Sequence, residues 1–267
     1  MTFPTRTMQP RRPMPTAPKP LLPLMLVLPF YSGDAWLLEK NLKWMKELDE
    51  KLAFDCLLSF DNQTDGKPLV TLAKEVFRSV DVFQYKRLPK TDWPVPQNHL
   101  FASLAWHMPN RNRPWLLLET DAVPVRPRWL HDIAEDHVAK KKPFSGHWSE
   151  TNKVFNGTAV YPPNVVRYSP KALEASIFED PKGRQSPWDV YGSNEIERYL
   201  NKANHLFQHC WNDDKTGKPY TFPTIDAVKA VVRKGVAVFH RCKDASLTLR
   251  LHEQNQKGYS KDFRWTI

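Results

Sequence analysis

Two carboxylates directly follow a strongly apolar run in the middle of the chain. Glu119 and Asp121 are spaced i and i+2 after the run Trp-Leu-Leu-Leu at residues 115–118, which is typical of a buried strand. Because side chains alternate along a strand, both carboxylates would lie on one face and could share a divalent cation. Oxygen ligands suit Mg²⁺ or Mn²⁺, and such a cation could neutralise a diphosphate leaving group. Capping of the following turn is the alternative role for this acidic pair.

A histidine ends the last apolar segment of the chain. His240 follows the apolar residues 236–239 and precedes Arg241 and Lys243. Its imidazole could be a further ligand of the same cation, and the two basic side chains could contact phosphate oxygens. A single histidine more often has a structural role, but its place at the end of a strand favours ligation here.

The spacing of apolar residues predicts the elements that would position these groups. Strands are expected at residues 24–28, 54–60, 82–85 and 115–118, and helices between them at 38–48, 72–80 and 100–108, with a loop at 29–33. This alternation indicates a mainly parallel sheet with helices on both faces and ligands beyond the carboxyl ends of the strands. After residue 143 the pattern predicts short strands at 143–148, 155–161 and 236–240 and helices near 170–177 and 193–202.

Composition excludes several classes of protein. With 267 residues, 41% of them hydrophobic and 25% charged, the chain is a folded globular protein. Its three cysteines are far apart and form no CxxC pair, so neither a disulfide framework nor a cysteine zinc site is supported, and a reducing, cytoplasmic location fits best.

The net charge of +10 lies at the two ends of the chain. Residues 1–20 contain four basic residues and no acidic one, and residues 229–267 contain nine basic and three acidic residues. A polyanionic partner such as DNA or a nucleotide would explain this distribution, and so would a basic tail of a soluble protein. Seven prolines among the first 23 residues predict a disordered leader at 1–20, followed by one domain at 21–267. The apolar run at 21–30 is too short to span a membrane, and its prolines disfavour a secretory signal.

The order of these features resembles a glycosyltransferase of the GT-A fold over roughly residues 21–250. The resemblance is firmest over Trp115–Leu130, where Glu119-Thr120-Asp121 stands at the place of the family's DxD motif. Glu119 departs from the usual first aspartate, which makes Asp121 the safer metal ligand. The resemblance implies a Rossmann-type half at 21–130 that binds a nucleotide-sugar. A smaller acceptor-side half with the C-terminal metal and phosphate strand follows at 131–267.

The resemblance also implies residues that bind the donor. Pro29, Phe30 and Tyr31 match the segment that packs on the nucleotide base, although Phe30 and Tyr31 are equally explained as core residues. Asp61 matches the group that binds the base or the ribose.

Three further residues are candidates for the donor side. Asn98 could face the donor, although a helix cap is the more common role for such a residue. Asn156 and Gly157 resemble the stretch that lines the donor sugar, where glycine permits close approach of the backbone and asparagine can bond hydroxyls. A hairpin turn is the alternative for this pair.

The acceptor side is expected around Trp188 and Asp189. In this fold an acidic residue between the metal motif and the last strand often deprotonates the acceptor hydroxyl, so Asp189 is the expected general base and Trp188 an apolar platform beside it. Asp189 could instead cap the following helix. Asp180 and Glu195 are reserve carboxylates that the spacing does not separate from Asp189.

The expected function is therefore metal-dependent transfer of a sugar from a nucleoside-diphosphate sugar, with a UDP-sugar favoured, to an acceptor hydroxyl. Mn²⁺ or Mg²⁺ would be the cofactor. The protein resembles the phage-encoded enzymes that glycosylate hydroxymethylated bases in its strong positive charge. Its basic ends, together with Trp93, Trp188 and Trp265, would suit a duplex with an extruded base. Double-stranded DNA that contains hydroxymethylpyrimidine is therefore a candidate acceptor. No obligate protein partner is evident.

Three alternatives stay open at the level of sequence. The acceptor could be a glycan or a lipid-linked molecule. A nucleotidyltransferase would use a similar acidic site, but the loop at 29–33 has one glycine where such enzymes have a glycine-rich loop. A non-catalytic nucleic-acid-binding protein would explain the charge and leave Glu119, Asp121 and His240 without a role.

Overall fold

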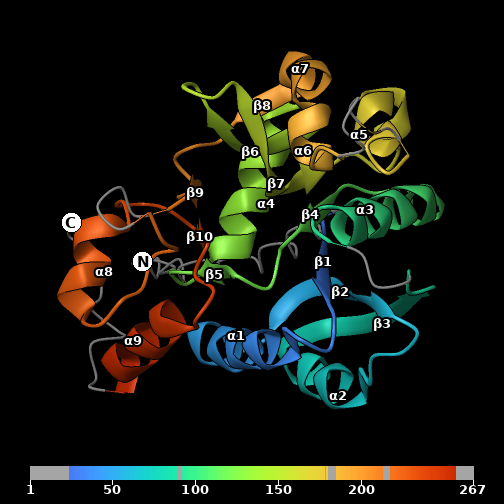
Figure 1. The fold of residues 1–267 in the computed structure, drawn as a ribbon. Helices are drawn as coiled ribbons and strands as arrows, with labels where there is room; N and C mark the ends of the chain where they lie inside the picture. Colours follow the sequence, from blue (N-terminus) through green and yellow to red (C-terminus); the bar gives the residue numbers. More distant parts are fainter. Residues whose placement is uncertain (1–23, 89–91, 178, 180–184, 213–216, 257–267) are drawn as a thin grey trace, which may run out of the picture.

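A seven-stranded sheet forms the centre of the described chain (Figure 1). The computed structural model describes residues 24–88, 92–177, 179, 185–212 and 217–256, so the leader predicted at 1–20 lies outside the described residues. The strand order is β3-β2-β1-β4-β7-β6-β8. The strands are β1 (Met25–Phe30), β2 (Leu52–Asp61), β3 (Phe77–Tyr85), β4 (Trp115–Leu117), β6 (Phe144–Ser149), β7 (Val154–Tyr161) and β8 (Leu200–Lys202).

The sheet is mainly parallel, as the sequence predicts. β1 pairs in parallel with β2 and β4, and β2 pairs in parallel with β3. β7 is antiparallel to β4 and β6, and β6 is parallel to β8. A second sheet of three strands has the order β5-β10-β9 and contains β5 (Ala122–Pro124), β9 (Phe207–His209) and β10 (Val238–His240). β10 is antiparallel to β5 and parallel to β9.

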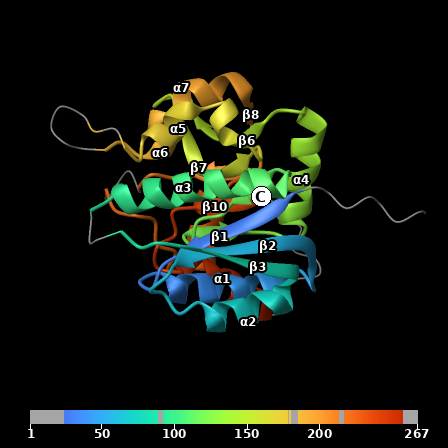
Figure 2. The same cartoon turned by 90° about the vertical axis from the view of Figure 1, so that its right-hand side faces the viewer.

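Helices cover both faces of the large sheet. Figure 2 shows α3 on one side of β1 to β3 and α1 and α2 on the other. Within the described residues, no helix combines the length and the apolar composition needed to cross a bilayer. The helices are α1 (Ala35–Leu48), α2 (Lys67–Val76), α3 (Val95–His107), α4 (Trp129–Lys140), α5 (Pro170–Glu174), α6 (Trp188–Tyr191), α7 (Ser193–Ile196), α8 (Ile225–Val231) and α9 (Ser246–Gln254), with 3₁₀ turns at Met108–Arg111, Val165–Arg167 and Glu197–Tyr199.

Strand β1 is apolar at every position because both of its faces are buried. Leu26 and Leu28 pack in the core under α1 and α2, whereas Met25 and Val27 pack in the core under α3. All four side chains are at most 1% exposed. A central parallel strand that is buried on both faces must be apolar throughout, so the alternation of a half-exposed strand is absent.

Three predicted boundaries are wrong. β1 continues through Pro29 and Phe30, so the turn begins after residue 30. Helix α2 ends at Val76, and Val80 belongs to β3, where it pairs with Cys56. The helix predicted at 193–202 ends by residue 199, because residues 200–202 form β8 and pair with residues 144–146 of β6. In the last two cases pairing with a distant strand overrides the local spacing.

Asp55 on β2 carries a cluster of ionic contacts that holds the edge of the sheet. Its Oδ1 accepts hydrogen bonds from Arg78 Nε at 2.9 Å and Ser79 Oγ at 2.5 Å, and its Oδ2 accepts from Arg113 Nη1 at 2.6 Å. Burial favours the neutral acid, but these three donors outweigh burial and lower the pKa of Asp55 to about 2.

We expect Asp55→Asn to lower the free energy of unfolding by about 1 kcal/mol at pH 7, a value reduced by solvent screening of the partly exposed guanidinium groups. Because the folded pKa is below the ordinary value of 3.8, this stabilisation is complete above pH 3.8 and is lost as the pH falls toward 2. Urea unfolding of both proteins at pH 7, 5 and 3 measures it, with the exposed Asp226→Asn as control. A difference at pH 3 as large as that at pH 7 would contradict this assignment.

Candidate active site

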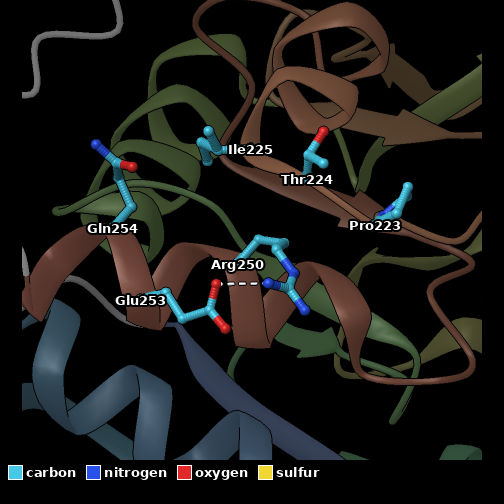
Figure 3. Close-up of a pocket in the computed structure, with 6 residues that line it drawn as sticks. All are labelled: Pro223, Thr224, Ile225, Arg250, Glu253 and Gln254. Atoms are coloured by element: carbon cyan, nitrogen blue, oxygen red, sulfur yellow. Dashed lines mark hydrogen bonds and ion pairs between the residues drawn. The ribbon is translucent and has the colours of Figure 1, made fainter.

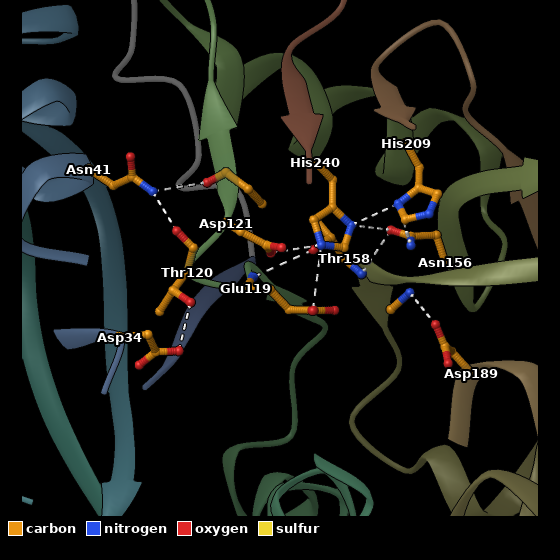
Figure 4. A network of polar contacts seen from close by, with 12 residues as sticks. Asp34, Asn41, Glu119, Thr120, Asp121, Asn156, Thr158, Asp189, His209 and His240 are labelled. Carbon is orange, nitrogen blue, oxygen red and sulfur yellow. Dashed lines mark hydrogen bonds and ion pairs between the residues drawn. The ribbon is translucent and has the colours of Figure 1, made fainter. Parts of the chain in front are cut away.

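The carboxylates predicted from the sequence lie between the two sheets. Glu119, Thr120 and Asp121 connect the end of β4 to β5, and Ala122 N donates to Glu119 O at 2.9 Å, which closes a tight turn. Because β5 pairs with β10, His240 lies opposite Ala122 and next to this turn (Figure 4). Strand pairing therefore brings together residues that are more than a hundred positions apart.

Glu119, Asp121 and His240 form a compact cluster, which we call the acidic–histidine cluster. His240 Nε2 lies 2.9 Å from Asp121 Oδ1 and 3.5 Å from Glu119 Oε2, and one potential ligand atom from each residue lies within 4.8 Å of the others. Asp121 and His240 are buried, whereas Glu119 is half-exposed. The structure thus brings together the three residues that the sequence nominates as metal ligands.

The cluster is strongly polarised. Burial alone would lower the pKa of His240, but the carboxylates of Asp121 and Glu119 outweigh burial and raise it. Burial would raise the pKa of Asp121, but His240, Lys243 and Arg241 lower it. Two carboxylates and one imidazole are a donor set that fits a hard divalent cation such as Mn²⁺ or Mg²⁺.

The residues after His240 attach β10 to the acidic turn. The backbone N–H groups of Arg241 and Cys242 both donate to Asp121 O, at 3.1 and 3.0 Å. Arg241 adopts a φ of 96°, which is unusual for a residue with a side chain. Its guanidinium lies over the Trp211 ring at 5.9 Å, and Lys243 is exposed. Both cations are close enough to lower the pKa of Asp121, and their contact with phosphate oxygens stays a prediction.

A second set of hydrogen bonds supports the acidic turn, and the residues that make it are not among those predicted from the sequence. Asn41 of α1 donates to Thr120 O at 2.8 Å and accepts from Thr248 Oγ1 of α9 at 2.7 Å. Thr120 Oγ1 donates to Asp34 Oδ2 at 2.8 Å. Burial raises the pKa of Asp34 to about 6. The turn is thus bonded to α1 through Asn41, and Asn41 is in turn bonded to α9.

Gly157 and Asp189 lie on the other side of the cluster. Gly157 N donates to Asp189 Oδ2 at 3.0 Å, and Val190 N donates to Asp189 Oδ1 at 3.0 Å. A Cβ at position 157 would lie 2.6 Å from Glu119 Oε1 and 3.4 Å from Asp189 Oδ2, so glycine allows both carboxylates to approach the strand. Burial raises the pKa of Asp189 to about 7, and the charge of Glu119 adds to this effect. Asp189 lies in the first turn of α6, but the N-cap of α6 is Pro187 and that of α7, which carries Glu195, is Gly192, so the capping alternative is wrong.

Asn156 lies beside the cluster, within β7 and not in a hairpin turn. Its Oδ1 is 3.0 Å from His240 Nδ1, and its Nδ2 is 2.9 Å from His209 Nδ1. His209 is absent from the sequence analysis because β9 is only three residues long. The alternation of Phe207 and His209 before the exposed Trp211 is a signal that could have indicated it.

Several other predicted site residues have roles outside the cluster. Phe30 is a core residue, with its ring centroid 4.9 Å from that of Phe60, while Tyr31 is 49% exposed. Pro29 is buried within β1. Asp61 is buried at the end of β2, where Oδ1 accepts from Gln63 N at 2.9 Å. Pro29, Tyr31 and Asp61 all lie at the carboxyl ends of β1 and β2, where the predicted donor contacts require them.

Asn98 and Trp188 correct the sequence analysis. Asn98 is neither at a helix end nor free to face a ligand, because its Nδ2 donates to the carbonyls of Ala175 and Ser186 and its Oδ1 accepts from Trp188 N at 2.8 Å. It thereby fixes the start of the helix that carries Asp189. Trp188 is only 6% exposed and stacks on Phe101 at 3.6 Å, so it is a core residue and offers no open platform.

Of the two reserve carboxylates, the structure describes Glu195 and gives it a role different from that of Asp189. Glu195 Oε2 accepts from Ser169 Oγ and Lys171 N at the start of α5, so it stabilises that helix and has no contact with the cluster. Asp180 lies outside the described residues.

A separate pocket lies between α8 and α9 (Figure 3). Within it Arg250 Nη1 and Glu253 Oε2 form an ion pair at 2.6 Å. None of the cluster residues lines this pocket, so it is unconnected with the site above. Its lining residues are Pro223, Thr224, Ile225, Arg250, Glu253 and Gln254.

The strand order, the second small sheet and the acidic turn between them define the GT-A fold of glycosyltransferases, as the sequence predicts. Several solved structures share this fold, and two of them are glycosyltransferases that match most of this chain. The galactosyltransferase LgtC in complex with donor and acceptor sugar analogues has a TM-score of 0.55 and 12% identity, covering 87% of this chain and 95% of that chain. The glycosyltransferase GlyE of Streptococcus pneumoniae has a TM-score of 0.51 and 10% identity, covering 88% and 65%.

A third similar structure is the bifunctional glycosyltransferase WbbM, with a TM-score of 0.54 and 8% identity over 84% of this chain and 46% of that chain. No protein-family model and no curated protein matches the sequence. At these identities the comparisons establish the fold, and the function must be argued from the site.

Proposed function

We propose that this protein is a metal-dependent glycosyltransferase that moves a sugar from a nucleoside-diphosphate sugar to an acceptor hydroxyl. The observation that carries the proposal is the acidic–histidine cluster, which lies beyond the carboxyl end of β4 in a GT-A fold. Ligands of open α/β sheets bind at this edge.

The cluster and its basic neighbours account for the leaving group. Asp121, His240 and Glu119 would hold Mn²⁺ or Mg²⁺, which when bound supplies positive charge to the departing diphosphate. Arg241 and Lys243 add two further cations for its oxygens. The nucleoside, which we propose to be uridine, would lie against the loop after β1 and the end of β2. Asn156 directs its amide toward His240 and His209, so its proposed contact with the donor sugar is limited to the second N–H of Nδ2.

Asp189 is the proposed general base. The backbone N–H groups of Gly157 and Val190 hold its two oxygens, and the raised pKa of about 7 makes the carboxylate basic enough to accept a proton near neutral pH. The acceptor oxygen forms a bond to the anomeric carbon, and its proton passes to Asp189. The bond from that carbon to the diphosphate oxygen breaks, and the diphosphate leaves with the electron pair.

The acceptor that we propose to test first is hydroxymethylpyrimidine in double-stranded DNA. Support comes from the positive charge at the ends of the chain and from Trp93, which is 66% exposed. Trp188 is buried and cannot contact a DNA duplex, and Trp265 lies outside the described residues. A glycan or lipid-linked hydroxyl is the alternative.

The test is release of free nucleoside diphosphate from a panel of nucleotide-sugars with Mn²⁺, with and without DNA that contains 5-hydroxymethylpyrimidine. We expect release from one donor, and its loss with EDTA. Dependence on the modified DNA would establish the acceptor, whereas release without regard to DNA would move the search to glycans and lipids. Absence of release from every donor would overturn the proposal in favour of a non-catalytic nucleic-acid-binding protein.

Gly157→Ala is expected to lower this release roughly 10- to 100-fold, because small displacements of reacting groups have effects of this size. The new methyl group would displace the flexible, half-exposed Glu119 side chain at 2.6 Å and would also press on the buried Trp188 ring at 3.0 Å, so a modest loss of stability is expected beside the loss of rate. Steady-state rates and the melting temperature measure the two effects. Gly146→Ala is the contrasting variant, because its methyl group meets the buried Ala159 Cβ at 2.6 Å and should lower stability instead. An unchanged rate in Gly157→Ala would contradict the role of this close approach.

A further inference from the structure

Four polar groups converge behind His240, on the side away from the carboxylates (Figure 4). His240 Nδ1 lies 3.0 Å from Asn156 Oδ1 and 3.0 Å from His209 Nδ1. Asn156 Nδ2 lies 2.9 Å from His209 Nδ1, and Thr158 N lies 3.2 Å from Asn156 Oδ1. The contacts close a triangle of three side chains with one backbone amide at its corner.

The backbone amide fixes every proton in this triangle. An N–H group can only donate, so the Asn156 atom that faces Thr158 N is the carbonyl oxygen, and the amide nitrogen of Asn156 faces His209. That nitrogen donates, so His209 Nδ1 must accept and the proton of His209 is on Nε2. His240 Nδ1 then faces two acceptors, Asn156 Oδ1 and His209 Nδ1, and must carry a proton.

We propose that His209 and Asn156 are positioning residues of the cation site. They hold a proton on Nδ1 of His240 and thereby leave Nε2 as the atom that faces Glu119 and Asp121. This inference rests on the proposed function, because it assigns the role of these residues toward the cation of that site. Hydrogen bonds to the second nitrogen of a metal-ligating histidine orient the ring and select its tautomer in this way.

The surroundings of His209 agree with a positioning role. The His209 ring packs edge-to-face on Trp211, with centroids 4.7 Å apart, and lies 4.8 Å from the His240 ring. β9 and β10 pair in register, with His209 opposite His240, so the backbone holds the two rings side by side. No carboxylate is among the hydrogen-bond partners of His209 in the described part of the chain, so its role is directed toward His240 and Asn156.

The test is the affinity of the protein for Mn²⁺ alone, measured from the electron paramagnetic resonance signal of free Mn²⁺ without any donor. His209→Leu removes the acceptor and should weaken Mn²⁺ binding 10- to 100-fold, as loss of a partner of a metal ligand does. His209→Asn places an amide oxygen near the former Nδ1 and should restore the affinity to within about threefold of the wild type. His205→Leu, which removes an exposed histidine, is the matched control.

A second readout is the exchange of the His240 Nδ1 proton with water, from long-range ¹⁵N–¹H correlation spectra of the Mg²⁺-loaded protein. The proton should exchange slowly in the wild type and in His209→Asn, and faster in His209→Leu, because the leucine removes one of the groups that enclose Nδ1. Should the leucine variant not fold, His209→Gln, which places its amide at the Nε2 position, provides the comparison.

The outcomes separate the two proposals. If His209→Leu binds Mn²⁺ as tightly as the wild type and its His240 Nδ1 proton exchanges equally slowly, the positioning role is overturned and the proposed function is left intact. Wild-type protein that binds no Mn²⁺ and releases nucleoside diphosphate in EDTA overturns the metal-dependent function, and the positioning role with it.

Discussion

Asp121→Asn is expected to lower the release of nucleoside diphosphate roughly 1,000-fold, equivalent to about 4 kcal/mol of transition-state stabilisation. Asp121 is the buried carboxylate of the acidic–histidine cluster, and its Oδ1 lies 2.9 Å from His240 Nε2. Asparagine keeps the shape of the side chain but removes the charge that a cation and the imidazolium both require. Initial rates at saturating donor, measured across a Mn²⁺ titration, give the size of the effect.

Two controls make this result specific. Asp226→Asn removes an exposed carboxylate of α8, whose ion pair is with Lys229, and should leave the rate unchanged. Thermal unfolding of Asp121→Asn should show a folded protein, because Asp121 O still accepts the backbone bonds from Arg241 and Cys242. A folded Asp121→Asn protein with wild-type turnover would remove the cluster from the reaction.

Asp189→Asn is expected to lower sugar transfer roughly 100- to 10,000-fold, the range for loss of a general base. An amide cannot take the proton of the acceptor hydroxyl. Binding of the donor and of Mn²⁺ should persist, because the hydrogen bonds of the Asp189 carboxylate are to the backbone of Gly157 and Val190, and none of them is to a residue of the cluster. Transfer to acceptor and donor hydrolysis by water are measured separately, together with donor affinity by calorimetry. Loss of transfer with retained hydrolysis locates Asp189 at the acceptor.

Glu195→Gln is the matched control for Asp189. Its carboxylate accepts from Ser169 Oγ and Lys171 N, so the substitution should lower stability without lowering the rate per folded molecule. If Asp189→Asn transferred sugar at the wild-type rate, or if Glu195→Gln alone abolished transfer, Asp189 would not be the base.

The sequence predicts the parallel half of the fold well because its signals are local. β1, β2 and β4 are apolar runs, and α1 has a clear helical stripe, so the carboxyl edge that holds Glu119 and Asp121 follows from periodicity alone. β5, β8 and β9 have three residues each, too short to show a period, and they exist through pairing with distant strands. Helix α4 was not expected, although Trp129, Leu130 and Ile133 have helical spacing.

The same distinction explains which site residues were found. His240 follows a recognisable strand and was predicted. His209 becomes relevant only because β9 pairs with β10, and Asn98 becomes structural only because the loop before Trp188 folds onto α3. Roles of this kind depend on long-range contacts that no local pattern contains.

The backbone of Arg241 indicates a compromise between stability and activity. A φ of 96° strains any residue with a side chain, by about 1–3 kcal/mol, and glycine would relieve much of that strain. The chain nevertheless has arginine there, and the proposed function assigns its guanidinium to the departing diphosphate. A screen that selects variants of this protein only for heat resistance should therefore favour glycine at position 241, and those variants should have a lower rate of sugar transfer.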